Sequence, residues 1–127
     1  MMFDLKFNEQ GLIPVIIQDV QSGEVLMEAY MDRTAVERTL KEKKTVFFSR
    51  SRNQYWIKGE TSGHTQEVHQ VLTDCDQDSL LIRVRQKGGA CHLGYRTCFV
   101  NELNDRGRIV KVIHEKMFDP DKVYKKS

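Results

Sequence analysis

Residues 14–31 read PVIIQDVQSGEVLMEAYM, two apolar runs that flank a short polar turn. The first run, residues 14–20, is rich in β-branched side chains, which fit the pleated surface of a strand. Gln21-Ser22-Gly23 is typical of a turn, and residues 24–31 then return to apolar side chains. This order predicts a β-hairpin.

A helix is predicted directly after the hairpin. Asp32 is a residue type that caps helix N-termini, and residues 34–37 read TAVE, which fits the capping-box pattern. Val36 and Leu40 lie four positions apart, so both fall on one helical face. The pattern predicts a helix over residues 33–43.

Further strands are predicted in the middle of the chain, over residues 45–48, 54–57, 67–72 and 80–85. Phe99 and Val100 could begin a late strand, and the polar remainder shows no clear pattern. Strands outnumber helices and no βαβ alternation appears. We therefore expect an α+β domain of mainly antiparallel β-strands with one principal helix.

The size and charge of the chain restrict its class. Its 127 residues suffice for one core, so we expect a single domain over residues 1–127. The formal charge of +2, from 20 basic and 18 acidic residues, gives no general basic field for nucleic acid. No apolar stretch approaches the roughly 20 residues of a transmembrane helix, and the N-terminus does not resemble a signal peptide. We therefore expect a cytoplasmic protein without a nucleic-acid or membrane partner.

Acidic residues alternate with other residues in the segment DCDQD, residues 74–78. In an extended chain, Asp74, Asp76 and Asp78 would point to one side and Cys75 to the other. The carboxylates suit magnesium or calcium, whereas the Cys75 thiolate suits zinc. An acidic turn with a buried thiol accounts for the pattern equally well.

Two more thiols lie in the segment CHLGYRTC, residues 91–98. Six residues separate Cys91 from Cys98, more than separate the paired cysteines of zinc knuckles. With Cys75 they make three candidate ligands, and three protein ligands plus a water is the pattern of catalytic zinc. Bound zinc lowers the pKa of its water to about 7, so hydroxide forms at neutral pH. The cysteines therefore favour a catalytic zinc over a structural one.

Histidines near these thiols are candidates for proton transfer. His92 adjoins the first of them, and His64 follows the flexible pair Ser62-Gly63. A histidine beside a metal ligand can instead only orient that ligand through a hydrogen bond, so both roles stay open for His92. For His69 and His114 we expect structural or solvent-exposed roles.

Two polar segments could bind phosphate through charge-assisted hydrogen bonds. One is the run Ser49, Arg50, Ser51 and Arg52. The other supplies Lys58, Thr61, Ser62 and Gly63. For the first segment, a solvated basic turn is the alternative. Tyr55 and Trp56 could stack on a base or could belong to the core.

Taken together, four separated segments resemble the phosphoribosyl-AMP cyclohydrolase family. They are SRSR (49–52), WIKGETSGH (56–64), DCDQD (74–78) and CHLGYRTCF (91–99). The resemblance begins at about residue 12 and includes PVI at 14–16 and VLM at 25–27. It implies zinc-dependent hydrolysis of the adenine ring C6–N1 bond of 1-(5-phosphoribosyl)-AMP to an opened imidazole carboxamide, the third step of histidine biosynthesis. It also implies the monofunctional form, in which no phosphoribosyl-ATP pyrophosphohydrolase domain follows.

The same resemblance implies an arrangement that sequence spacing cannot show. It implies an intertwined homodimer with zinc sites between the subunits, where Cys75 of one chain joins Cys91 and Cys98 of the other. It also implies magnesium at Asp74, Asp76 and Asp78. The substrate is then a nucleotide whose two phosphates need two anion sites, and the two polar segments are the candidates. Hydroxide on zinc would add to C6, and His92 would assist.

Two other classes of protein use similar residues. A small zinc-stabilised RNA-binding module would explain the cysteines, arginines and aromatics, but the near-neutral charge argues against it. Strongly salt-dependent RNA binding without hydrolysis would favour that module. A metal-buffering or redox protein would instead show rapid, reversible thiol oxidation when its metal is bound.

Overall fold

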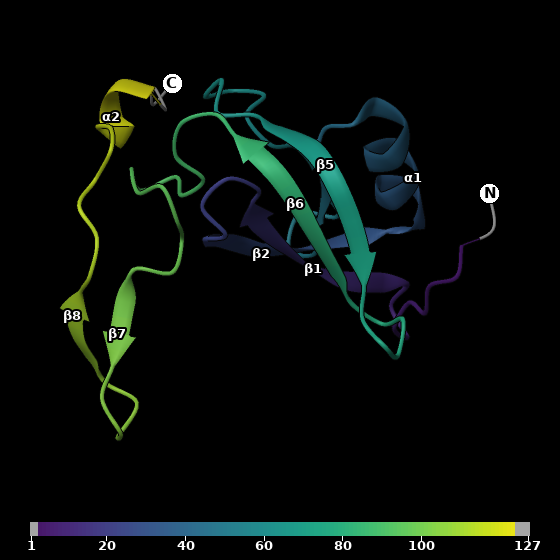
Figure 1. Cartoon of the computed structure of the whole chain (residues 1–127), viewed down its shortest axis with the longest axis horizontal. Helices are drawn as coiled ribbons and strands as arrows, with labels where there is room; N and C mark the ends of the chain where they lie inside the picture. Colours follow the sequence, from purple (N-terminus) through teal and green to yellow (C-terminus); the bar gives the residue numbers. More distant parts are fainter. Residues whose placement is uncertain (1–2, 124–127) are drawn as a thin grey trace.

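The structure, a computed structural model, describes residues 3–123. Its elements follow in the order β1 (Leu12–Asp19), β2 (Val25–Asp32), α1 (Arg33–Glu42), β3 (Val46–Ser49), β4 (Gln54–Ile57), β5 (Gln66–Thr73), β6 (Leu80–Gln86), β7 (Asn101–Leu103), β8 (Ile109–Val112) and α2 (Pro120–Val123). A four-stranded sheet of order β2-β1-β6-β5 forms the centre, while β3-β4 and β7-β8 form two-stranded sheets (Figure 1). The expected α+β class, with mainly antiparallel strands and few helices, is confirmed.

The central sheet is antiparallel except at one pair of strands. β1 and β2 form the predicted hairpin, with Val15 opposite Ala29. β5 and β6 are also antiparallel, with Val71 opposite Ile82. β1 and β6 run parallel, with Ile17 beside Ile82. This parallel pair was not predicted, because all the elements from β2 to β5 separate its two strands in sequence. The sequence also lacks the βαβ pattern that usually indicates parallel strands.

The core lies against one face of this sheet. Ile13, Val15 and Ile17 alternate along β1 and have no exposed surface, whereas Ile16 between them is exposed. Side chains from the neighbouring strands and the helix complete the cluster: Leu26, Met27, Met31, Ala35, Val36, Val46, Phe47, Leu80, Ile82, Val84 and Ala90. Burial of each large aliphatic side chain contributes about 1.5–3 kcal/mol, so this cluster is the main source of stability.

Helix α1 (Arg33–Glu42) begins at the predicted residue and ends one residue before the predicted end. The Asp32 carboxylate accepts the Ala35 N–H at 2.8 Å, which caps the N-terminus. At the other end, Lys43 adopts a left-handed conformation (φ 57°) and donates its N–H to the Thr39 carbonyl. The observed helix therefore stops one residue before the predicted end. The second Asp32 oxygen accepts the Tyr55 hydroxyl, a bond that raises the pKa of Tyr55 and fixes the β3-β4 hairpin beside the helix.

The β3-β4 hairpin is held by aromatic packing. The rings of Phe47 and Trp56 lie opposite each other, with centroids 4.7 Å apart. Asn53 closes the turn with a positive φ of 52°. Beyond β4, the Lys58 N–H donates to the Thr45 carbonyl at 3.2 Å. The hairpin thus carries both predicted phosphate-binding segments, one at its turn and one after its second strand.

Beyond β6, strands β7 and β8 form a hairpin that stands apart from the central sheet (Figure 1). Its apolar side chains are more than half exposed: Leu103, Ile109, Val110 and Val112. The expected late strand begins at Asn101 rather than at residue 99 or 100, and β8 was not predicted. Within residues 3–123, the structure contains no helix with the length and apolarity needed to cross a membrane.

Candidate functional site

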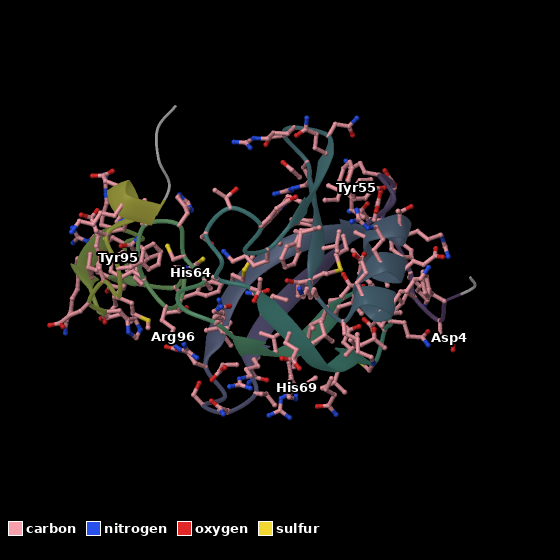
Figure 2. All side chains as sticks on the ribbon, turned by 90° about the horizontal axis from the view of Figure 1, so that it is seen from above. Asp4, Tyr55, His64, His69, Tyr95 and Arg96 are labelled. Carbon is pink, nitrogen blue, oxygen red and sulfur yellow. The ribbon has the colours of Figure 1, made fainter. Side chains whose placement is uncertain are left out.

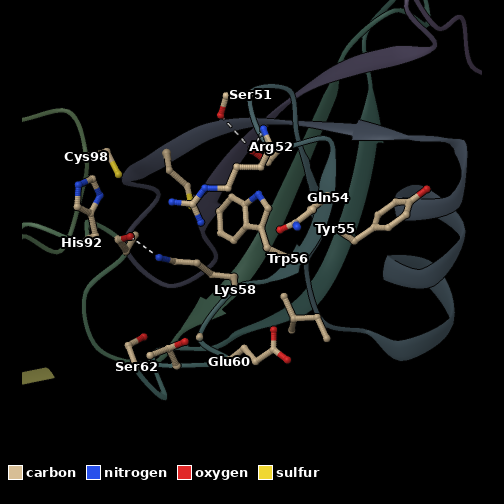
Figure 3. Close-up of a pocket in the computed structure, with 16 residues that line it drawn as sticks. Ser51, Arg52, Gln54, Tyr55, Trp56, Lys58, Glu60, Ser62, His92 and Cys98 are labelled. Atoms are coloured by element: carbon tan, nitrogen blue, oxygen red, sulfur yellow. Dashed lines mark hydrogen bonds between the residues drawn. The ribbon is translucent and has the colours of Figure 1, made fainter. Parts of the chain in front are cut away.

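A cavity of about 620 Å3, here called the site pocket, opens between the β3-β4 hairpin and the chain that follows β6 (Figure 3). Its lining includes most of the predicted phosphate ligands together with one predicted histidine and one predicted cysteine: Ser49, Ser51, Arg52, Lys58, Thr61, Ser62, His92 and Cys98. The remaining lining residues are Met27, Gln54, Tyr55, Trp56, Ile57, Gly59, Glu60 and Ala90. The fold therefore gathers residues that are far apart in sequence around one space.

The thiol of Cys98, which lines this pocket, lies beside the thiol of Cys91. Residues 88–98, here called the cysteine segment, double back on themselves, since the Cys91 N–H donates to the Tyr95 carbonyl at 3.0 Å. The Cys98 N–H then donates to the Leu26 carbonyl of β2 at 2.7 Å. Cys91 is buried and Cys98 is exposed. Two sulfurs that are separated by six residues in sequence are thus neighbours in space.

The surroundings of Cys98 favour its neutral form. Cys98 is exposed as a whole residue, but partial loss of solvation around its sulfur, followed by the adjacent Cys91 thiol, raises the pKa of Cys98 to about 12. The Lys58 ammonium acts in the opposite direction and only partly offsets this rise. A metal ion bound here would replace the protons, because thiolates rather than thiols are the ligands. Two adjacent sulfurs at a pocket wall fit zinc by donor type, and they supply half of a tetrahedral set.

Lys58 lies beside these thiols. Its side chain is buried, and its Nζ donates to the Ala90 carbonyl at 2.5 Å (Figure 3). Burial lowers the pKa of Lys58, whereas the nearby Cys98 and Cys91 raise it. The predicted contact between Lys58 and a substrate phosphate remains a prediction.

The side chains of the polar turn after β3 line two neighbouring hollows, the site pocket and a second one beside it. Ser49 and Ser51 border both, and the Ser49 hydroxyl accepts the Arg52 N–H at 3.3 Å. Arg52 lines the site pocket, whereas the Arg50 guanidinium lies over the Tyr30 ring, 4.0 Å from its centroid, beside a shallower neighbouring hollow. Of the two arginines, Arg52 is therefore the one placed to reach a ligand in the site pocket.

The two candidate histidines occupy different surroundings. His92 is exposed and lines the site pocket. Figure 2 shows His64 on the side of the molecule that also carries Tyr95 and Arg96. His64 lies outside the pocket lining, with its ring packed edge-on against Phe118 and the ring centroids 4.6 Å apart. Its buried Nδ1 has no hydrogen-bond partner among the described residues. His92 is thus the histidine that a ligand in the pocket would meet, while His69 and His114 are exposed, as expected.

The acidic segment forms the exposed turn between β5 and β6. The Asp74 carboxylate accepts the N–H groups of Asp78 and Ser79, at 3.0 and 3.3 Å. Desolvation alone would raise the pKa of Asp74, but these hydrogen bonds outweigh it and lower the pKa. Hydrogen bonding to Asp74 and its charge raise the pKa of Asp78. The Cys75 thiol donates to Asp76 at 3.3 Å and is exposed, in contrast to the buried thiol of the alternative interpretation.

Cys75 and Cys91 lie at opposite ends of β6. That strand has seven residues, and a strand rises about 3.3 Å per residue, so its ends are roughly 20 Å apart. Sulfur ligands of one zinc ion lie only about 4 Å apart, since each Zn–S bond is about 2.3 Å. Within residues 3–123, no group of three or more His, Cys, Asp or Glu side chains is arranged to hold a metal ion. One chain therefore supplies the Cys91 and Cys98 pair without a third ligand.

Residues 27–100, more than half of the chain, match the family model described as phosphoribosyl-AMP cyclohydrolase. The chain belongs to the phosphoribosyl-AMP cyclohydrolase family. Proteins named phosphoribosyl-AMP cyclohydrolase are similar over nearly the whole chain. That of Pelotomaculum thermopropionicum is 54% identical over 99% of both chains, and that of Methanosarcina barkeri is 54% identical over 97% of this chain and 92% of its own. That of Chlorobium chlorochromatii is 50% identical over 96% of this chain and 88% of its own.

Membership of the cyclohydrolase family confirms the resemblance drawn from the four motifs. The site pocket draws on three of those motifs, because SRSR, the segment after β4 and the cysteine segment all contribute to its lining. The fourth motif, with Cys75 and its aspartates, lies at the far end of β6. The positions of its residues in an assembled metal site remain a prediction.

In this member of the cyclohydrolase family, no sequence pattern indicated the residue that binds the cysteine segment to the sheet. Arg96 forms ion pairs with Asp19 at 3.3 Å and Glu24 at 3.5 Å, and it donates to the Gly88 carbonyl. Burial alone would raise the pKa of Asp19, but hydrogen bonds from Ser22 and the Arg96 cation lower it. The contact joins residues more than 70 positions apart, so no local pattern could have revealed it.

Proposed function

We propose that this chain hydrolyses the adenine ring of 1-(5-phosphoribosyl)-AMP, using zinc held in part by Cys91 and Cys98. The observation that carries the proposal is that Cys98, with the Cys91 thiol beside it, lines the same pocket as Arg52 and His92. The relatives of the chain are named for this reaction. A thiol pair, a cation and a histidine around one cavity suit a metal-dependent hydrolase of a phosphorylated substrate.

We further propose that the zinc site is shared by two copies of the chain. β6 holds Cys75 too far from Cys91 for both to bind one ion within a chain. The exposed Cys75 of a second copy could complete the set. The apolar side chains of the β7-β8 hairpin offer a surface that a homodimer would bury.

The pocket residues have distinct parts in the proposed reaction. Arg52 would bind a substrate phosphate through charge-assisted hydrogen bonds, while Ser51 and Ser62 add hydroxyl donors. The indole of Trp56 would pack against the adenine ring. When bound, zinc would activate the attacking water as a Lewis acid. The C6–N1 bond then breaks, and His92 is placed to move a proton between the attacking water and the departing N1.

Magnesium is proposed at the aspartate turn, where the described side chains do not by themselves form a set of three ligands, so that waters or a substrate phosphate would complete its shell. Asp76 and Asp78 are exposed, and a hydrogen bond with Asp74, followed by the Asp74 charge, raises the pKa of Asp78, as expected for crowded carboxylates. A divalent cation would relieve this repulsion, and carboxylate oxygens are the ligands that magnesium prefers. Its role would be to hold a substrate phosphate at the edge of the shared site.

The decisive experiment is ultraviolet-monitored hydrolysis of 1-(5-phosphoribosyl)-AMP with zinc and magnesium present, repeated after tight chelation. Ring opening that stops on chelation and returns with zinc supports the proposal. A folded, zinc-loaded protein that leaves the substrate intact overturns it. His92→Asn is expected to lower kcat by about 10²–10⁴-fold with zinc content unchanged. His69→Asn is the matched control, because His69 is an exposed histidine outside the site pocket.

A further inference from the structure

Lys58 occupies an unusual place for a lysine. Its side chain is buried, with only 7% of the residue exposed, although lysine is among the residues least often buried. Its backbone is fixed, because its N–H donates to the Thr45 carbonyl at the end of the β3-β4 hairpin. The side chain therefore extends from a rigid base into the wall of the site pocket (Figure 3).

The Lys58 ammonium binds the backbone of the cysteine segment. Its Nζ donates to the carbonyl of Ala90, the residue directly before Cys91. The Ala90 N–H in turn donates to the Arg96 carbonyl at 2.8 Å, so Ala90 is held from both sides. A charge-assisted bond to a buried carbonyl is stronger than a neutral one, and its loss leaves that carbonyl without its charged donor.

Two further hydrogen bonds hold the end of the cysteine segment that carries Cys98. Cys98 donates its N–H to Leu26 of β2, and the Thr97 hydroxyl donates to Val25 at 2.8 Å. Those bonds fix the end that carries Cys98, whereas Lys58 fixes the end that carries Cys91. The positive charge of Lys58 also lies close to both sulfurs, where it offsets the repulsion between two thiolates.

We propose that Lys58 is a positioning residue that sets the spacing of Cys91 and Cys98 for metal binding, rather than a ligand of the substrate phosphate. The assignment deepens the proposed function and rests on it for the identity of the metal. The holding of Ala90 by Lys58 does not depend on zinc. The positioning role of Lys58 and the proposed zinc function can therefore be tested separately.

The test compares Lys58→Met with Lys58→Arg and with Lys41→Met, which removes an exposed lysine from α1. Substrate KM and two further quantities are measured on the full chain. The first is hydrogen exchange at the Ala90 and Cys91 amides of the metal-free protein. The second is zinc affinity, obtained by competition with a chromophoric chelator. Far-UV circular dichroism checks that each variant is folded.

Lys58→Met is expected to speed exchange at these two amides by about tenfold or more and to weaken zinc binding by a similar factor, as for a lost charge-assisted hydrogen bond. Lys58→Arg keeps a charged donor and should retain most of the protection, while Lys41→Met should leave both quantities unchanged. If Lys58→Met proves unfolded, Lys58→Gln replaces it, with the same expected direction.

Unchanged exchange and unchanged zinc affinity in the folded neutral variant overturn the proposal. A rise in substrate KM as the sole change also overturns it, since that result makes Lys58 a phosphate ligand. If the unaltered protein holds no zinc at these thiols, the proposed zinc function fails. The exchange comparison then still decides whether Lys58 positions the cysteine segment.

Discussion

The Arg96 guanidinium lies 3.3 Å from the Asp19 carboxylate and joins the cysteine segment to the β1-β2 turn. The Asp19 side chain is 3% exposed, and the Arg96 side chain is 31% exposed. A carboxylate so deeply buried needs its partners, because an uncompensated charge in the interior is costly. The placement of one wall of the site pocket therefore depends on an ion pair formed outside the pocket.

Replacement of Arg96 by Met is expected to lower the free energy of unfolding by about 1–3 kcal/mol, because Asp19 keeps its bonds to Ser22 but loses its cation. Urea denaturation measures the change. Arg38→Met is the matched control, since Arg38 pairs with Glu42 on the exposed face of α1. That substitution should cost no more than about 0.5 kcal/mol. Equal losses in the two variants would contradict the assigned role of Arg96.

The same carboxylate predicts a loss of stability in acid. The pKa of Asp19 in the folded protein lies below its ordinary value of 3.8, so its contribution is present above pH 3.8 and is lost as pH falls through the folded pKa. Urea midpoints measured from pH 6 down to pH 2 should fall less steeply in Asp19→Asn than in the unaltered protein, over the range below about pH 4. Parallel curves would show that other groups cause the decline.

Subunit mixing tests the shared zinc site. Cys75→Ser and Cys91→Ser should each be inactive and bind zinc weakly. A mixed dimer of the two variants retains one intact site of two, and mixing in equal amounts makes half of the dimers mixed. After unfolding and refolding together, about a quarter of the activity should return. If the mixture stays inactive while each variant still forms dimers, the thiols are not shared between subunits.

Two aspartates of the β5-β6 turn should respond differently to substitution. Asp74→Ala removes the acceptor of two backbone N–H groups and is expected to destabilise the protein by about 1 kcal/mol. Asp76→Ala touches no backbone bond of the turn and should leave stability within about 0.5 kcal/mol. It should nevertheless raise the magnesium concentration needed for activity. An unchanged magnesium dependence in Asp76→Ala would remove that residue from the proposed magnesium site.

Gly88 and Gly107 form a matched pair for measuring the packing around His64. Both adopt a positive φ, 71° and 78°, so alanine costs about 1 kcal/mol of backbone strain at either position. A Cβ at Gly107 would meet open space, whereas one at Gly88 would lie 2.5 Å from the His64 ring. Thermal or urea unfolding should therefore show a larger loss for Gly88→Ala. Equal losses would mean that the His64 ring moves away freely.

The sequence predicted those parts of the fold that depend on neighbouring residues. The hairpin around Gln21-Ser22-Gly23 and the helix capped by Asp32 both follow from local patterns and were confirmed. The parallel contact of β1 with β6 was missed because it depends on how distant strands pack. β8 was missed because its strand is short and wholly exposed, so burial leaves no alternation in the sequence.

For the candidate site, too, the sequence predicted what depends on residue type and missed what depends on tertiary contacts. The residue types indicated a metal site, a phosphate-binding site and a histidine for proton transfer. The fold brings one residue of each kind, Cys98, Arg52 and His92, to one pocket. The sequence could not assign partners, because those depend on tertiary contacts. The Arg50 guanidinium lies over the Tyr30 ring, and the Lys58 ammonium donates to the Ala90 carbonyl. Both are basic residues in plausible phosphate segments, and only their surroundings distinguish them from Arg52.

The position of the β7-β8 hairpin also has a consequence for synthesis on the ribosome. The central sheet is complete once β6 has emerged from the ribosome, and the cysteine segment can then bind β2 through Cys98 before residue 101 emerges. The apolar side chains of the hairpin emerge after both. Chains begin to fold from the N-terminus during translation. The apolar hairpin is therefore exposed to solvent only after the strands of the central sheet have paired with one another, when their edges are no longer free to pair with it. The order of elements along the chain thus protects the nascent protein from association before its sheet is closed.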